Sequence, residues 1–483
     1  MHDIGLLIGS EQRQALDGET FERLNPVTEM AVTRAAAARA KDANAAAEAA
    51  AAAFPAWTAI GPNARRTMLL AAAAALAARA GDFTAAMQDE IGATAAWAGF
   101  NVTLAASMLR EAAALTTQVT GETIPSDKPG CLAMSVRQPA GVCLGIAPWN
   151  APVILGVRAI AAALACGNTV ILKASEVCPR THGLIGDAMR AAGLPAGVVN
   201  VITNAPADAA EIVNALIDHP AVKRINFTGS TKVGRLIAER AARHLKPVLL
   251  ELGGKAPFVV LKDANLDEAV KAAAFGAFFN QGQICMSTER IILEEPIADA
   301  FIAAFAAKAA TLQAGDPTDG TAPLGAIVSR ESARHVEALV DDAVAQGAHV
   351  LAGNAAGEIL TGAVVIDGVT PGMRAYAEES FGPMVTIVRA ADADDAVRIA
   401  NDTEYGLSAA VFGSDIARTL AVAQRIQSGI CHINGPTVHD EAQMPFGGVK
   451  ASGYGRFGGQ AGIAEFTDLR WITIETRPGH FPI

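Results

Sequence analysis

Short runs of β-branched and apolar residues alternate with helix-forming segments, and this alternation restricts the fold more than any other feature. The runs TVILKASE, VVNVITN and RINFTGS are separated by the segments THGLIGDAMRAAG and ADAAEIVNALIDH, which have helical patterning. A second block of the same kind begins at residues 256–261. Strands that alternate with helices at this spacing form βαβ units in a parallel, doubly wound sheet. The sequence therefore predicts an α/β protein.

The size and charge of the chain narrow its class further. With 483 residues, of which 51% are hydrophobic, the chain is too long for one ordinary domain, so we expect two major units. Alanine-rich segments with helical patterning dominate residues 32–118. The net charge of −11, without a long basic run, argues against nucleic acid and anionic membrane surfaces as partners.

Two further features indicate a soluble, cytoplasmic protein. The longest apolar stretches are interrupted by Arg65, Arg66, Arg79 and Arg158, and neither has the roughly 20 residues that a membrane-spanning helix needs. The first residues, MHDIGLLIGSEQRQ, have no positively charged region before their short apolar run, unlike a signal peptide. We therefore expect neither membrane insertion nor secretion.

The cysteines show no CxxC motif and no spacing typical of paired metal ligands, so no metal site is predicted. Without a secretion signal they are expected to be reduced, and any one of them can be a small buried hydrophobic residue. In the stretch QGQICMSTER, Cys285 could instead be half of a disulfide, a metal ligand or a nucleophile. The six cysteines are Cys131, Cys143, Cys166, Cys178, Cys285 and Cys431.

Two strand ends could form a nucleotide site. In INFTGSTKVG, Gly229 would let the backbone approach a phosphate, and Ser230 precedes the positive end of a helix. In TVILKASEVCP, Lys173 and Glu176 lie just past a strand, at the edge where open α/β sheets bind ligands. An acidic side chain there can accept hydrogen bonds from the hydroxyls of a ribose. It would also repel a 2′-phosphate, which favours NAD over NADP. Each segment taken alone has an equally good structural explanation without a ligand: an ordinary turn for the first and a solvent-exposed loop for the second.

A second group of residues has the chemistry of an acyl-transfer site. Glu251 ends the apolar run PVLLELGG, where a carboxylate is either paired or held with a raised pKa for proton transfer. Cys285 follows Gly282 and Gln283, which suggest a tight turn whose N–H groups could stabilise a thiolate and an oxyanion. Asn150, in IAPWNAPV, opens a predicted helix, and its side-chain amide could donate a hydrogen bond to the oxyanion.

At these residues the sequence resembles the aldehyde dehydrogenase superfamily over essentially its whole length. The motifs PWN, FTGST, ELGGK, GQICMS, EESFGP and PFGG occur in the order and spacing of that family. The resemblance implies a Rossmann-type NAD-binding domain, a catalytic α/β domain and a small β oligomerisation arm. On this reading, residues 1–118 and 141–250 bind NAD, residues 251–440 are catalytic, and residues 119–140 and 460–483 form the arm of a homodimer or homotetramer.

The same resemblance assigns roles to individual residues. Cys285 corresponds to the nucleophile and Glu251 to the general base, and Asn150 forms an oxyanion hole with the backbone N–H of Cys285. The cysteine would attack the aldehyde, hydride would pass to NAD, and Glu251 would activate the water that hydrolyses the thioester. The expected cofactor contacts are Pro148, Trp149, Lys173, Ser175, Glu176, Gly229, Ser230, Val233, Leu252, Glu379 and Phe381.

Other functions remain as alternatives. A CoA-acylating or an aliphatic-aldehyde dehydrogenase would share this fold, but transfer to CoA needs no water-activating base such as Glu251. A thiol hydrolase needs a histidine partner for Cys285, and none of the nine histidines has an evident link to it. A structural protein is disfavoured because each catalytic position holds a competent residue.

The stretches AWAGFN, GETIPSDK, HINGPTVHDEAQMPFGG and SGYGRF are most similar to aromatic-aldehyde members, the salicylaldehyde and vanillin dehydrogenases. Trp97 would form a flat wall for an aromatic ring, with ordinary helix packing as the alternative. On a helix from Asn150, Arg158 would share a face with the oxyanion donor and bind a phenol, methoxy or carboxylate oxygen, unless it pairs with a distant acid. The expected substrate-pocket residues are Trp97, Ala151, Arg158, Ile284, Val438 and His439.

Overall fold

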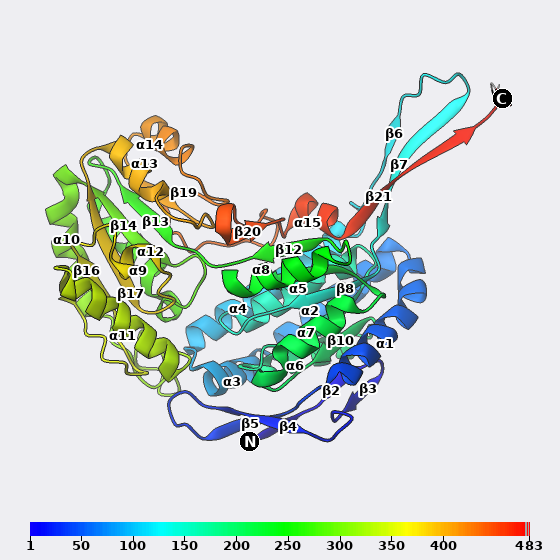
Figure 1. Cartoon of the computed structure of the whole chain (residues 1–483), viewed down its shortest axis with the longest axis horizontal. Coiled ribbons are helices and arrows are strands. Elements are labelled where there is room, and N and C mark those ends of the chain that lie inside the picture. Colours follow the sequence, from blue (N-terminus) through cyan, green and yellow to red (C-terminus); the bar gives the residue numbers. More distant parts are fainter. Residues whose placement is uncertain (479–480, 482) are drawn as a thin grey trace.

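The computed structural model describes residues 1–478, 481 and 483. Two α/β units lie side by side, and a narrow arm of strands projects from the first unit near the C-terminus (Figure 1). Each unit has one large, mostly parallel sheet. The predicted α/β fold is confirmed, and the two units correspond to the two blocks of alternating strands and helices in the sequence.

The first sheet has eight strands, and its five central strands are parallel. The outer strands at both edges run antiparallel to their neighbours. One edge strand, β20, comes from the end of the chain, so the C-terminal segment returns to the first unit. In spatial order the strands are β20 (Gly453–Tyr454), β12 (Val248–Glu251), β11 (Val222–Thr228), β8 (Val142–Ile146), β9 (Thr169–Lys173), β10 (Val199–Ile202), β2 (Leu6–Ile8) and β3 (Glu11–Arg13).

Helices cover both faces of this sheet. Along β9, Val170 and Leu172 join one buried cluster and Ile171 joins another, as the two-residue period of a strand requires. The first cluster includes α2 (Pro62–Ala78), α3 (Ala80–Ile91), α4 (Ala95–Leu115), α5 (Pro152–Ala165) and α6 (Pro179–Ala191). The second includes α1 (Ala40–Ala59), α7 (Ala209–Asp218) and α8 (Thr231–Ala242). Because both faces are covered, most residues of the central strands are apolar and buried.

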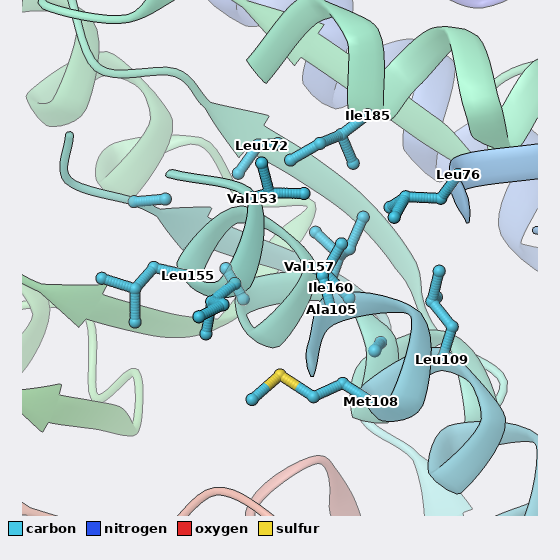
Figure 2. Close-up of a cluster of buried hydrophobic side chains, with 14 of the residues drawn as sticks. Leu76, Ala105, Met108, Leu109, Val153, Leu155, Val157, Ile160, Leu172 and Ile185 are labelled. Carbon is cyan, nitrogen blue, oxygen red and sulfur yellow. The ribbon is translucent and has the colours of Figure 1, made fainter. Parts of the chain in front are cut away.

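Helix α5 is the centre of the larger cluster, and every one of its residues is buried. Figure 2 shows Val153, Val157 and Ile160 of this helix among side chains of α2, α4, α6 and β9. A helix that is apolar all round must lie inside the protein, so the segment's high hydropathy reflects core packing. Its one charged residue, Arg158, is also buried.

Two expectations about local structure are wrong. The helix predicted to open at Asn150 begins at Pro152, whose fixed φ and missing N–H suit a first helical position. Residues 31–36 form the strand β5 (Ala31–Ala36) and not a helix. This strand pairs with β1 (His2–Ile4) and β4 (Thr20–Leu24) in a separate three-stranded sheet. Pairing on both sides outweighs the helix propensity of its alanines.

The second unit is built around a seven-stranded sheet that is parallel except for one edge strand. Its strands, in spatial order, are β15 (His349–Ala352), β16 (Val364–Asp367), β17 (Met384–Ala390), β14 (Thr288–Glu294), β13 (Ala256–Val260), β18 (Ala410–Phe412) and β19 (His432–Ile433). Helices α9 (Leu266–Phe278) and α10 (Glu295–Ala310) pack in one cluster. Helices α11 (Arg330–Ala345), α12 (Arg374–Ala377), α13 (Ala393–Asn401) and α14 (Ile416–Ala423) pack in another.

The projecting arm is an antiparallel sheet of β6 (Glu122–Ile124), β7 (Cys131–Pro139) and β21 (Thr467–Glu475) (Figure 1). Leu469 and Trp471 of β21 are exposed. The short helix α15 (Gly459–Glu465) precedes β21 and lies against α4 and α5. Single turns of 3₁₀-helix are η1 (Pro206–Asp208), η2 (Phe279–Gly282) and η3 (Lys450–Ser452).

Within the described residues, no single helix has the length and apolar character needed to cross a membrane. Only the pair α2 and α3, bent by 61° between them, reaches these limits together.

Candidate active site

A cavity of about 740 Å³ lies at the carboxyl ends of β8, β9 and β11. This is the edge of a parallel sheet at which α/β proteins bind ligands, and the volume is typical of small-molecule sites. Eight of the expected cofactor contacts line it: Pro148, Trp149, Lys173, Ser175, Glu176, Gly229, Ser230 and Val233. Leu252, Glu379 and Phe381 do not line this cavity.

Lys173 and Glu176 form an ion pair on the cavity wall, with Nζ 2.9 Å from Oε2. Burial alone would raise the pKa of Glu176, but the charge and the hydrogen bond of Lys173, together with a backbone hydrogen bond, outweigh burial, and the pKa is lowered. The wall therefore presents an ionised carboxylate and a cation that is already partnered.

The turn before α8 brings its backbone close to the same cavity. A Cβ on Gly229 would lie 2.4 Å from Cζ of Phe227, so a larger residue cannot occupy this position without displacing the ring. Ser230 caps the helix, and its Oγ accepts the N–H of Val233 at 3.3 Å. The positive end of α8 thus faces the cavity, as expected for a site that binds a pyrophosphate.

His182, which the sequence analysis did not single out, connects this cavity to α5. The backbone N–H of Ser175 donates to His182 Nδ1 at 3.0 Å, and Nε2 lies 3.1 Å from the carbonyl oxygen of Pro152. Burial lowers the pKa of His182 to about 3, so the ring is neutral and its remaining proton is on Nε2. The imidazole thereby ties the cofactor loop to the segment that carries Asn150.

Cys285 follows an unusual turn between α9 and β14. Asn280, Gln281 and Gly282 have φ values of 50°, 55° and 70°, in the left-handed region. A Cβ on Gly282 would lie 2.0 Å from the carbonyl oxygen of Gly382, so glycine is required there. Two consecutive non-glycine residues in this region cost on the order of 1–3 kcal/mol each and occur where the surroundings enforce them.

The surroundings do enforce this turn through amide side chains. Gln281 accepts the N–H of Gly325 at 2.9 Å, and Gln283 accepts the N–H of Val328 at 2.9 Å. Both glutamines also donate to the carbonyl oxygen of Ala326. The expected tight turn is therefore present, and its position is fixed by a loop more than 40 residues further along the chain.

Glu251 is the last residue of β12 and is completely buried. Neither carboxylate oxygen has a hydrogen-bond partner of good geometry among the described residues. Burial raises the pKa of Glu251 to about 7, although the Arg158 guanidinium and the nearby Cys285 thiol oppose the rise. A carboxyl with such a pKa can exchange protons near neutral pH, as a general base must.

The Cys285 thiol is half-buried and shares its surroundings with that carboxyl. Burial and the carboxylate of Glu251 raise the pKa of Cys285 well above its usual value, and Arg158 lowers it. The other five cysteines are also free thiols. The thiol therefore has to lose its proton before it can attack a substrate as a thiolate.

Asn150 is held on both sides. Its Nδ2 donates to the carbonyl oxygen of Gln283 at 3.0 Å, which leaves the second N–H of the amide for another acceptor. The backbone carbonyl oxygen of Asn150 accepts hydrogen bonds from the indole N–H of Trp97 at 2.9 Å and from the side-chain amide of Asn280 at 3.2 Å. The structure therefore places the amide of Asn150 beside the turn that carries Cys285.

Four of the expected substrate-pocket residues are buried in one hydrophobic cluster. Trp97, Ala151, Ile284 and Val438 belong to the buried cluster against which Cys285 packs. The indole of Trp97 is 2% exposed, stacked on Phe100 and edge-on to Phe279. Trp97 is therefore packed in the core as well as close to the reacting residues. By contrast, His439 is half-exposed and its Nε2 lies 3.1 Å from Glu441.

Arg158 forms the ion pair that was left open as the alternative to a substrate contact. Its partner is Asp440, 282 residues further along the chain, and the two side chains are each 6% exposed. The guanidinium also lies over the ring of Phe446, 4.0 Å from its centroid. The charge of Arg158 lowers the pKa of Glu251 and of Cys285, and the charge of Asp440 raises both.

Of the three remaining cofactor residues, Glu379 and Phe381 come from the second unit, and Leu252 lies in the first unit against α8. Glu379 Oε1 accepts the backbone N–H of Gly254 at 2.9 Å, and burial raises the pKa of Glu379 to about 8. The ring of Phe381 is edge-on to Trp149 at 5.7 Å, which joins this segment to the cofactor cavity. Leu252 packs against Gly234, where a Cβ would meet its methyl group at 2.5 Å.

A buried ion pair anchors the segment that carries Glu379. Lys255 Nζ lies 2.8 Å from Glu289 Oε2, and Glu289 also accepts the N–H and the hydroxyl of Ser380. The lysine was visible in the motif ELGGK, but its partner is in β14, and only the three-dimensional pairing identifies it. The same holds for Asp440 and His182, which follow no recognisable sequence pattern.

A cysteine thiol, a buried carboxyl with a pKa of about 7 and an amide donor, set beside a nucleotide-sized cavity, are the groups that a thiol-dependent oxidoreductase with a nucleotide cofactor needs. Residues 13–472 match the aldehyde dehydrogenase family. The chain is 61% identical, over the full length of both chains, to a vanillin dehydrogenase of Pseudomonas fluorescens. It is 50% identical to a salicylaldehyde dehydrogenase of Pseudomonas putida over 99% of each chain.

Solved structures agree. The structure of a salicylaldehyde dehydrogenase from Pseudomonas putida G7, complexed with salicylaldehyde, superposes with a TM-score of 0.98, 48% identity and complete coverage of both chains. The chain therefore belongs to the aldehyde dehydrogenase family. It is an oxidoreductase that acts on aldehydes with NAD or NADP, so the resemblance seen in the sequence is confirmed.

Proposed function

We propose that the protein oxidises aromatic aldehydes of the vanillin, salicylaldehyde or benzaldehyde type to carboxylic acids, with NAD as the preferred cofactor. The observation that carries the hydrolytic reaction is the buried, unpartnered carboxyl of Glu251 beside the Cys285 thiol. The aromatic substrate is supported by the full-length likeness to vanillin and salicylaldehyde dehydrogenases. The aromatic lining around Trp97 supports it as well.

In the proposed mechanism, Cys285 releases its thiol proton to solvent and attacks the aldehyde carbon as a thiolate. The amide of Asn150 and the backbone N–H of Cys285 stabilise the oxyanion of the thiohemiacetal. When bound, the nicotinamide accepts the hydride that leaves this carbon. Glu251 then takes a proton from water, which hydrolyses the thioester and releases the acid.

The residues of the cofactor cavity suit a dinucleotide. The close approach of the backbone at Gly229 and the amide end of α8 suit a pyrophosphate, and the ionised Glu176 suits the hydroxyls of a ribose. Val233, 42% exposed at the cavity wall, would lie against the adenine. Glu379 and Phe381 would hold the nicotinamide half. The carboxylate of Glu176 would repel a 2′-phosphate, which is the basis of the proposed NAD preference.

The domain roles and the assembly are part of the same proposal. Residues 1–118 and 141–250 would bind the cofactor, residues 251–440 would supply the cysteine, and the arm (residues 119–140 and 460–483) would join subunits in a homodimer or homotetramer. The exposed apolar residues of β21 support an interface role for the arm. The reduced state of the six cysteines is compatible with a cytoplasmic location.

The test is a panel of aldehydes assayed for NADH formation with and without coenzyme A. The proposal expects kcat/KM for substituted benzaldehydes to exceed that for short aliphatic aldehydes, with turnover independent of coenzyme A. A strict requirement for coenzyme A would replace hydrolysis by acyl transfer. A preference for aliphatic aldehydes would overturn the substrate class and leave the chemistry of Cys285 standing.

A further inference from the structure

The ion pair of Lys255 and Glu289 is buried more completely than a structural role requires. Lys255 Nζ lies 2.8 Å from Glu289 Oε2, and the two side chains are 0% and 4% exposed. Taking two charges out of water is costly, and replacing such a pair by apolar residues is often neutral for stability. A pair of this kind therefore calls for a reason beyond stability.

The further hydrogen bonds of the pair converge on one segment, residues 378–382. The ammonium also donates to the carbonyl oxygen of Glu378 at 2.6 Å. The second carboxylate oxygen, Oε1, accepts the N–H of Ser380 at 3.0 Å and its hydroxyl at 2.8 Å, and it accepts the N–H of Phe381 at 3.3 Å. The pair thus fixes the backbone on both sides of Glu379.

The backbone of Phe381 shows that these contacts impose a conformation. Its φ is 45°, in the left-handed region that a bulky residue rarely adopts. The ring is edge-on to that of Trp149, which lines the cofactor cavity, and the two centroids are 5.7 Å apart. The carboxylate of Glu289 therefore holds the N–H of a residue whose unusual backbone turns its ring toward that cavity.

Close backbone contacts join the same segment to Cys285. A Cβ on Gly254 would lie 2.3 Å from the carbonyl oxygen of Cys285, and the N–H of Gly254 donates to Glu379 Oε1 at 2.9 Å. A Cβ on Gly282, in the turn before the cysteine, would lie 2.0 Å from the carbonyl oxygen of Gly382. No side chain separates these backbones, so a displacement of the segment changes the position of Glu379 relative to Cys285.

We infer that the ion pair of Lys255 and Glu289 sets the position of the nicotinamide half of the cofactor relative to Cys285, and thereby the rate of hydride transfer. In the proposed function, on which this inference rests, Glu379 and Phe381 hold that half of the cofactor. Lys255 and Glu289 act through this segment, so both are positioning residues. A displacement of reacting groups by about 1 Å can slow a reaction by about 10²-fold, so a small shift is measurable.

Three variants weaken the pair to different extents. The double variant Lys255→Met/Glu289→Leu removes it and leaves no unpaired buried charge. Glu289→Gln keeps the shape of the side chain but removes the charge that faces the ammonium. Ser380→Ala removes only the hydroxyl that Glu289 accepts.

The matched control is Glu294→Gln. Glu294 lies at the other end of the same strand, β14, and is also buried. It accepts the N–H of Lys262 at 2.6 Å and pairs with Arg418 at 3.6 Å. Neither partner belongs to residues 378–382, so this variant reports the general effect of neutralising a buried carboxylate.

Each protein is measured in three ways. NADH formation is followed in single turnovers, with enzyme in excess over benzaldehyde, so that hydrolysis of the thioester does not enter the rate. The same measurement with benzaldehyde deuterated at the aldehyde carbon identifies hydride transfer as the slow step. The Kd values of NAD and of ADP, which lacks the nicotinamide half, are measured by calorimetry without aldehyde. Amide hydrogen exchange over residues 378–384 is measured in the protein without cofactor.

We expect the single-turnover rate to fall about tenfold or more in Glu289→Gln and in the double variant, with slower reaction of the deuterated aldehyde. Ser380→Ala should show a smaller fall. The Kd of NAD should rise while that of ADP stays within about twofold of wild type, because the adenosine half is bound by the first unit. Exchange over residues 378–384 should be faster in these variants, and Glu294→Gln should match the wild type throughout.

The inference is wrong if the single-turnover rates of both Glu289 variants stay within about twofold of that of Glu294→Gln. It is also wrong if the Kd of ADP rises as much as that of NAD, because the pair then supports the whole cofactor site. If the double variant does not fold, Glu289→Gln and Ser380→Ala decide the outcome. Glu379→Gln separates this failure from that of the proposed function: if it keeps the wild-type rate, the proposed cofactor contact is wrong and the inference falls with it. If it alone is slow, only the inference is wrong.

Discussion

In the cofactor cavity Lys173 and Glu176 pair with each other at an open wall, whereas at the reacting centre Glu251 is fully buried with neither oxygen partnered. The cavity lowers the pKa of its carboxyl, and the reacting centre raises the pKa of its carboxyl to about 7. A binding site benefits from groups of fixed charge, while a proton-transfer site needs a group that changes its charge. The two regions lie side by side but meet opposite electrostatic requirements.

If the two regions are separable, removing the nucleophile should leave cofactor binding intact. We expect Cys285→Ala to lose turnover by about 10³-fold or more, because the covalent route is closed. The Kd for NAD, measured by fluorescence or calorimetry, should stay within about threefold of wild type, since Cys285 does not line the cofactor cavity. Turnover above one hundredth of wild type in a pure preparation would show that another residue attacks the aldehyde.

The next largest effect is expected for Glu251, whose carboxyl has no hydrogen-bond partner among the described residues. Glu251→Gln keeps the shape of the side chain but cannot accept a proton, so thioester hydrolysis should slow by roughly 10²–10⁴-fold. Rapid mixing should then show a burst of NADH close to one equivalent of active sites, followed by slow turnover. A variant that lacks the burst would show that Glu251 is also essential for the attack by Cys285.

The raised pKa of Glu251 can be tested through the pH profile of the wild-type enzyme. A general base acts in its ionised form, so the hydrolytic step should be fastest above pH 7 and fall about tenfold per unit as the pH drops below 7. The same step in Glu251→Gln should show no inflection there. A wild-type profile that stays flat down to pH 5 would contradict the raised pKa.

The cofactor cavity is tested through the preference of the enzyme for NAD or NADP. Glu176→Gln removes the charge that repels a 2′-phosphate and frees Lys173 to bind it, so the ratio of kcat/KM for NAD to that for NADP should fall about tenfold or more. Glu239, another acidic residue that lines the cavity, provides the control Glu239→Gln. Equal shifts in the two variants would assign the preference to general charge and not to Glu176.

The two regions also differ in how far the sequence predicts them. The turns at Lys173 and Gly229 follow single strands, so a local pattern placed them at a sheet edge. The family resemblance supplied the other expected contacts, and eight of the eleven line one cavity. The reacting centre is assembled from distant segments. Asp440 lies 282 residues from Arg158, and Trp97 lies 53 residues from Asn150, so no local pattern could pair them.

The errors in local structure have the same origin. Residues 32–36 begin the alanine-rich segment that was expected to be helical, but strands on both sides take their backbone hydrogen bonds. The start of α5 was misplaced by two residues because Pro152, and not Asn150, opens the helix. The loop that carries Asn150 is held by the indole of Trp97 and the carbonyl of Gln283 instead of by helical hydrogen bonds. Long-range pairing decides what local propensity leaves open.

The smallest expected effect concerns Trp97, which is both core residue and expected wall of the substrate pocket. Trp97→Phe keeps an aromatic ring but removes the indole N–H that the carbonyl of Asn150 accepts at 2.9 Å. One such hydrogen bond contributes about 0.5–1.5 kcal/mol, which corresponds to a loss of roughly 2- to 12-fold in kcat if it positions the oxyanion donor. KM for aromatic aldehydes should change little, whereas Trp97→Ala should weaken all of them alike by removing the wall. If Trp97→Phe instead raises KM at unchanged kcat, the indole contacts the substrate directly. In that case the amide of Asn280, and not Trp97, positions the backbone of Asn150.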